Sequence, residues 1–180
     1  MMGKKIIFFD GDGTLWYPKK TKYKEKPDWI YSLKGNHKEH IKYLILTPTV
    51  LTTLRKLKKD GLILVLLSTH PQKRRKAKIV INEKVNYFKL NNLFDEIHPT
   101  PNKGLNKSKG LWILKILKKR KIPKKYALMV GDSYKWDYKP ARDIGIDSVL
   151  IDSDYRKEHH IGKRIKKIIR NLKEVLDIID

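Results

Sequence analysis

Two aspartates lie two residues apart where a short apolar run ends near the N-terminus. The segment Asp10-Gly11-Asp12-Gly13-Thr14 follows the run Ile6–Phe9. A carboxylate at the end of a buried strand can attack phosphorus, glycines let a phosphate approach the backbone, and a second carboxylate can protonate the leaving oxygen. An Asp-Gly turn or a calcium-type loop would use the same residue types. The segment therefore predicts phosphate chemistry, with these two alternatives open.

A second pair of acids follows another apolar run. Asp132 and Asp137 stand just beyond Ala127–Val130. Carboxylate oxygens near a phosphate suit Mg²⁺, which neutralises charge and keeps several of its waters. Either aspartate taken alone also fits a helix cap. Two acids facing Asp10 across one sheet edge favour a magnesium site.

Hydroxyl side chains end a third apolar run. Ser68 and Thr69 follow Leu62–Leu67. A hydroxyl and a neighbouring N–H at a strand end can hold a phosphoryl oxygen, although a serine or threonine there is also a common helix cap. The basic run at 73–76 comes next; we expect it to be a solvated helix face, with indirect contact to the phosphate as the alternative.

The apolar runs predict the sheet that positions these side chains. Each is rich in Ile, Val, Leu or Phe, as is typical of parallel strands buried on both faces. A fourth run, Ser148–Ile151, and a weaker strand at Asp95–His98 bring the expected number of strands to five.

Amphipathic patterns between the runs predict helices at Pro48–Lys59, Ser108–Arg120 and Lys157–Ile179. The first should stop at Gly61, and Ser108 should cap the second. The residues expected to face inward are Leu51, Leu54 and Leu57 in the first helix, Leu111, Leu114 and Leu117 in the second, and Ile165, Ile168, Leu172, Val175, Leu176 and Ile179 in the third. Strands alternating with helices indicate a doubly wound, mainly parallel α/β domain with helices on both faces and its ligand beyond the carboxyl ends of the strands.

Length and composition limit the possible function classes. The 180 residues fit one domain, 1–180, and carry 42 Lys and Arg against 19 Asp and Glu, a net charge of +23. Such a field favours anionic partners, either phosphate esters or nucleic acid. Cysteine is absent, so thiolate chemistry is excluded, and no run is long enough to span a membrane; a cytoplasmic protein is expected. Nothing in the sequence indicates an oligomeric state.

The irregular stretch 15–47 combines aromatic residues with lysines. We interpret it as a flap or small insert rather than a large cap. Its aromatics could instead stack on nucleic-acid bases beside a charge that follows the backbone, and that alternative stays open.

Taken together, these segments resemble the haloacid dehalogenase superfamily, whose members are mostly phosphohydrolases. The resemblance spans Lys4 to Asp152. Its first motif has the form DxDx[TV], which Asp10, Asp12 and Thr14 match, and its fourth motif pairs acids after a strand, as Asp132 and Asp137 do. Among capless members, the chain is most similar to the magnesium-dependent phosphatase group, with Thr14-Leu15-Trp16 following the nucleophile.

The two middle motifs are less specific. A strand ending in Ser or Thr matches Leu62–Ser68, and a Lys at a helix start matches Lys109, with Lys103 and Lys107 as competitors. We prefer Lys109 because Ser108-Lys109-Gly110 opens a helix and would aim the ammonium at the phosphate.

The resemblance implies a mechanism. Asp10 would attack phosphorus to form an aspartyl-phosphate, and Asp12 would protonate the leaving group and then activate water. Mg²⁺ would be held by Asp10, the main-chain carbonyl of Asp12 and Asp132, with Asp137 in support. Ser68 and Lys109 would neutralise the phosphoryl oxygens. A response-regulator-like receiver shares the fold plan and the acidic pocket, but the Asp10–Thr14 segment argues against it.

Overall fold

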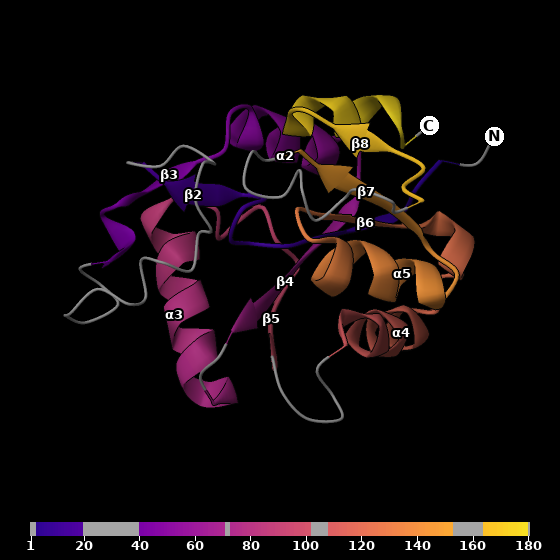
Figure 1. Ribbon diagram of the computed structural model, residues 1–180, viewed down its shortest axis with the longest axis horizontal. Helices are drawn as coiled ribbons and strands as arrows, with labels where there is room; N and C mark the ends of the chain where they lie inside the picture. Colours follow the sequence, from indigo (N-terminus) through magenta and orange to yellow (C-terminus); the bar gives the residue numbers. More distant parts are fainter. Residues whose placement is uncertain (1–2, 20–39, 71–72, 102–107, 153–163, 180) are drawn as a thin grey trace.

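A parallel sheet forms the centre of the computed structural model, which describes residues 3–19, 40–70, 73–101, 108–152 and 164–179. The strand order is β5-β4-β1-β6-β7-β8, and every neighbouring pair is parallel (Figure 1). The six strands are β1 (Ile6–Phe9), β4 (Ile63–His70), β5 (Glu96–Pro101), β6 (Ala127–Gly131), β7 (Asp147–Ile151) and β8 (Ile168–Ile169). All five expected strands are present, and β8 is a sixth that the sequence did not predict.

Helices cover both faces of this sheet, so the doubly wound α/β class is confirmed (Figure 1). The helices are α2 (Val50–Lys59), α3 (Arg74–Tyr87), α4 (Lys109–Arg120) and α5 (Lys139–Asp143), with short turns η2 (Lys124–Tyr126), η3 (Tyr134–Tyr138) and η5 (Leu172–Asp177). Alternate residues of β1 point to opposite layers. Ile7 and Phe9 pack in the layer of α2, α3 and η5, whereas Ile6 and Phe8 pack in that of α4 and α5.

Two of the helix predictions are confirmed with small changes. Helix α2 buries Leu54 and Leu57 and ends just before Gly61, whose φ is 80°. In α4 the hydroxyl of Ser108 accepts from the Gly110 N–H over 3.2 Å, as a cap does.

The inward face assigned to α4 was partly wrong. Leu111 is 41% exposed, and the buried stripe is formed by Gly110, Ile113, Ile116 and Leu117. Ile113 and Ile116 pack in the core layer beside Leu117, and Leu111 lies outside it.

The helix predicted at the C-terminus is also wrong in its described part, residues 164–179. Ile168 and Ile169 extend along β7 as strand β8, and η5 begins only after Asn171. Asn171 and Glu174 form a capping box there, which starts a new turn and separates it from the strand. The apolar spacing read as one helix is thus shared between a strand and a short 3₁₀ turn.

The ends of the stretch 15–47 form a small ribbon beside the main sheet (Figure 1). Strand β2 (Trp16–Pro18) pairs antiparallel with β3 (Leu44–Leu46). Residues 20–39 lie outside the described residues, and the described part of the chain contains no separate cap. Residues 73–76 are exposed, as expected for a solvated run. No helix among the described residues is long and apolar enough to cross a membrane.

Candidate active site

Three adjacent strands deliver the predicted polar residues to one edge of the sheet. β1 lies between β4 and β6, and all three run in the same direction. Asp10 follows β1, Ser68 lies in the last part of β4, and Asp132 follows β6. The Asp10 N–H still donates to the Val130 carbonyl over 2.9 Å, so the carboxylate is carried by a regular strand end. Asp10, Ser68 and Asp132 are all buried.

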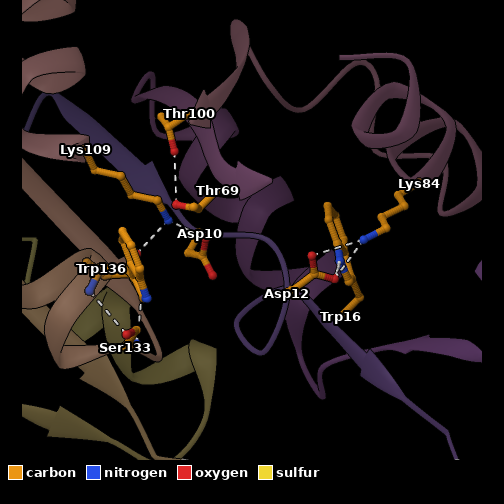
Figure 2. Close-up of polar contacts among 10 residues, drawn as sticks. Asp10, Asp12, Trp16, Thr69, Lys84, Thr100, Lys109, Ser133 and Trp136 are labelled. Carbon is orange, nitrogen blue, oxygen red and sulfur yellow. Dashed lines mark hydrogen bonds and ion pairs between the residues drawn. The ribbon is translucent and has the colours of Figure 1, made fainter. Parts of the chain in front are cut away.

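Lys109 joins this edge from the first turn of α4. Its side chain is only 1% exposed, and its ammonium donates to Oδ1 of Asp10 (Figure 2) and, over 2.6 Å, to Oδ1 of Asp137. A buried ammonium needs such partners, because an unpaired charge in the interior is costly. The position preferred for the phosphate lysine therefore faces the predicted nucleophile. Lys103 and Lys107 lie outside the described residues.

Asp137 reaches the site from η3, a single π-helical turn. The Ser133 N–H donates to its Oδ2 over 2.9 Å, and the Ser133 hydroxyl accepts from the Trp136 N–H over 3.2 Å. Gly131 makes room, since a Cβ there would come within 2.4 Å of the Asp137 side chain. The turn and the glycine together hold the Asp137 carboxylate inside the pocket.

The acids form a cluster that fits a divalent cation. One carboxylate oxygen from each of Asp10, Asp132 and Asp137 lies within 4.8 Å of the others. Among the described residues these three acids outnumber the Lys109 ammonium that contacts two of them, so the buried pocket has an excess of negative charge once the acids are ionised. Hard oxygen donors with this charge suit Mg²⁺. The side chain of Asp137 thus joins Asp10 and Asp132, whereas that of Asp12 does not.

Burial alters the acidity of the pocket. Loss of solvent raises the pKa of Asp10 to about 7, although the Lys109 ammonium pulls in the opposite direction. Burial also raises the pKa of Asp137. Burial alone would lower the pKa of Lys109, but Asp10 and Asp137 outweigh it and raise that pKa. Without a metal, burial therefore favours the protonated form of Asp10 up to about pH 7.

The raised pKa of Asp10 predicts a pH-dependent stability for the metal-free protein. Between the ordinary aspartate pKa of 3.8 and about 7, the folded chain binds a proton that the unfolded chain has released. The contribution of Asp10 to the free energy of unfolding is therefore complete below this pH window, and it is lost as the pH rises through the window. Urea unfolding with chelator at about pH 5 and about pH 8 should show wild type losing stability relative to Asp10→Asn. If the difference in unfolding free energy between wild type and Asp10→Asn is the same at both pH values, the prediction is wrong.

The hydroxyl residues occupy different positions around the pocket. A Cβ on Gly11 would lie 3.0 Å from the Ser68 Oγ, so that hydroxyl faces the loop after β1. The Thr69 hydroxyl instead pairs with that of Thr100 over 3.0 Å (Figure 2). Thr14 is fully buried, and its hydroxyl has no hydrogen-bond partner among the described residues. Ser68 is therefore better placed than Thr69 to offer a hydroxyl to a phosphate.

A family profile described as haloacid dehalogenase-like hydrolase matches residues 14–151. The match covers more than half of the chain and begins directly after Asp10-Gly11-Asp12-Gly13. The chain belongs to this family. The resemblance inferred from the motifs, and the assignment to a hydrolase, are thus confirmed. No curated protein matches the chain.

Solved structures share the fold of this haloacid dehalogenase-like hydrolase over nearly its whole length. A candidate phosphatase from Clostridium difficile has a TM-score of 0.73 at 20% identity, covering 100% of both chains. A haloacid dehalogenase-like family hydrolase from Streptococcus pneumoniae has a TM-score of 0.72 at 18% identity, also covering 100% of both. A HAD phosphatase from Thermococcus onnurineus has a TM-score of 0.66 at 19% identity, covering 97% of each. At these identities the likeness concerns the fold.

Asp12 lies apart from the Asp10 cluster in this hydrolase (Figure 2). Its Oδ1 accepts from the indole N–H of Trp16 over 2.8 Å and from Nζ of Lys84 over 2.8 Å. Sequence reasoning missed Lys84. A signal was present, because Lys84 occupies the buried stripe of α3 formed by Ala77, Val80, Ile81 and Val85, where a charged residue needs an explanation.

The aromatic residues of 15–47 were considered as a base-stacking surface. Trp16 and Tyr17 are buried, and Tyr43 is 45% exposed. Tyr23, Trp29 and Tyr31 lie outside the described residues. Among the described aromatics of this stretch, only Tyr43 presents an open ring.

Proposed function

We propose that this hydrolase is a Mg²⁺-dependent phosphatase that cleaves phosphate monoesters through an aspartyl-phosphate on Asp10. The observation that carries the proposal is the buried meeting of Asp10, Asp132 and Asp137 around Lys109. A carboxylate nucleophile, a pocket suited to a divalent cation and a fixed ammonium are what phosphoryl transfer requires. The phosphatases among the structurally similar proteins support the same reaction.

The first half of the reaction transfers the phosphoryl group to the protein. A carboxylate oxygen of Asp10 attacks phosphorus, and the bond from phosphorus to the ester oxygen breaks. Asp12 gives that departing oxygen a proton, so an alcohol leaves. Lys109 and Ser68 neutralise the phosphoryl oxygens as charge shifts among them.

The second half returns the enzyme to its starting state. Asp12, now a carboxylate, takes a proton from a water molecule that attacks the phosphorus of the aspartyl-phosphate. The bond to Asp10 breaks, releasing inorganic phosphate and the Asp10 carboxylate. Both proton transfers use the same residue in opposite directions.

Asp10, the main-chain carbonyl of Asp12 and Asp132 would hold Mg²⁺, with Asp137 as a fourth oxygen donor or an anchor for Lys109. The ion, when bound, neutralises the charge shared by nucleophile and phosphate. Ionisation of Asp10 is then favoured, because a nearby cation opposes the effect of burial on its pKa.

A panel of phosphate monoesters assayed with Mg²⁺ and with chelator tests the proposed reaction. At least one ester should be hydrolysed with Mg²⁺, and chelator should lower the rate by about 100-fold or more until Mg²⁺ is added back. A chain that cleaves none of the esters, or that is unaffected by chelator, would refute the proposal.

End-phosphorylated oligonucleotides belong in the same panel, because the net charge of +23 favours any anionic substrate. Preferential release of their terminal phosphate, weakening steeply with salt, would identify nucleic-acid ends as the substrate. Equal rates on small esters and on oligonucleotides would indicate that the positive charge attracts phosphate groups in general, without a preference for nucleic acid.

A further inference from the structure

The carboxylate of Asp12 is held by two elements that contribute nothing to the Asp10 cluster. Lys84 of α3 donates to its Oδ1 over 2.8 Å and to its Oδ2 over 3.1 Å. Trp16 of β2 donates its indole N–H to Oδ1 over 2.8 Å. Figure 2 shows this group on the far side of the loop from Asp10 and Lys109. Asp12 is therefore fixed in one orientation by directional donors.

The ion pair lies where its strength should be high. The Lys84 side chain is 2% exposed and that of Asp12 is 17% exposed. A charge-assisted hydrogen bond strengthens as water is excluded, since the local dielectric falls. Removing Asp12 from Lys84 would take two hydrogen bonds from a buried ammonium, which is costly.

The donors themselves are held rigidly. The Lys84 ammonium lies 5.5 Å from the centre of the Trp16 ring, within cation–π range. The Trp16 ring in turn stacks on Phe88, at the end of α3, with centroids 6.0 Å apart and an interplanar angle of 15°. Two elements distant in sequence thus form one fixed cradle for Asp12.

We propose that Lys84 and Trp16 are positioning residues that set the orientation in which Asp12 exchanges protons with the leaving group and with water. This rests on the proposed function, in which Asp12 is the acid and base. In-line attack by Asp10 places the leaving oxygen on the side of phosphorus away from Asp10. The cradle fixes the Asp12 carboxylate on the side of the loop away from Asp10, and the proposal puts the leaving oxygen on that side. A carboxylate free to rotate would transfer a proton less efficiently.

Lys84→Met tests this through the dependence on the leaving group. An alkyl phosphate needs a proton on its departing oxygen, whereas 4-nitrophenyl phosphate releases an anion that is stable without one. Loss of the ionic hydrogen bonds should lower kcat/KM for the alkyl ester by about 10- to 100-fold, and much less for the aryl ester. Lys78→Met, an exposed lysine of the same helix, should change neither.

A double-mutant cycle separates positioning from a merely structural role. In an Asp12→Asn background, Lys84→Met should have little further effect on the alkyl ester, because both changes act through one residue. Trp16→Phe should reproduce the leaving-group pattern and provides a second route if Lys84→Met folds poorly.

Equal losses on both esters, or additive losses in the cycle, would overturn the positioning role while wild type still hydrolyses phosphate. Absence of hydrolysis by wild type would instead refute the proposed function itself. The two failures are therefore distinguishable.

Discussion

Replacing Asp10 with asparagine is expected to abolish phosphate ester hydrolysis while the protein stays folded. The amide has the size of the carboxylate but is a poor nucleophile, so no phosphoryl-enzyme forms. Loss of a covalent nucleophile typically lowers kcat by roughly 10⁴-fold or more. Steady-state rates on the best monoester of the panel, with saturating Mg²⁺, measure the change.

Asp60→Asn is the matched control for that experiment. Asp60 lies at the exposed end of α2 and pairs with Lys56 at the surface over 2.7 Å. An exposed ion pair of this kind contributes little, so activity should stay at the wild-type level. Turnover by Asp10→Asn comparable to that of Asp60→Asn would exclude Asp10 as the nucleophile.

Replacing Lys109 with methionine is expected to damage both activity and stability. Its ammonium would otherwise neutralise phosphoryl oxygens, and loss of one such donor costs about 10²- to 10³-fold in kcat. The same change leaves Asp10 and Asp137 buried without their counter-charge, for which about 3–5 kcal/mol of unfolding free energy is a typical loss. Urea denaturation in chelator should show the loss, and Mg²⁺ should recover part of it.

The pH provides an internal check on the Lys109 variant. Protonation can relieve two buried carboxylates, so the stability loss should be smaller at about pH 5 than at about pH 8. Lys118→Met, at an exposed position of α4, controls for loss of a positive charge on the same helix. A Lys109→Met variant as stable and active as Lys118→Met would contradict the pocket described here.

Local sequence patterns were sufficient where the physical cause is local. The runs that became β1, β4, β6 and β7 are apolar on both faces, which is typical of parallel strands covered by helices on both sides. The cap at Ser108 placed Lys109 at a helix start, and the strand order then brought it to Asp10.

Prediction failed where partners are distant in the chain. Strand β8 forms because Ile168 and Ile169 pair with the edge of β7. The spacing of apolar residues in this segment does not reveal that a strand edge lies beside it. The Asp12–Lys84 pair joins residues 72 positions apart. Nothing near Asp12 indicates which lysine of so basic a chain will reach it.

The most direct test of Asp10 as the nucleophile is to trap the phosphoryl group on the protein. Asp12→Asn, mixed with 4-nitrophenyl phosphate and Mg²⁺, lacks the base that activates water and should accumulate the intermediate. Acid quenching, digestion and mass spectrometry should then find one phosphoryl group on the peptide that contains Asp10. A phosphoryl group on Ser68 or elsewhere, or nitrophenol release with no labelled peptide at any time, would contradict the account.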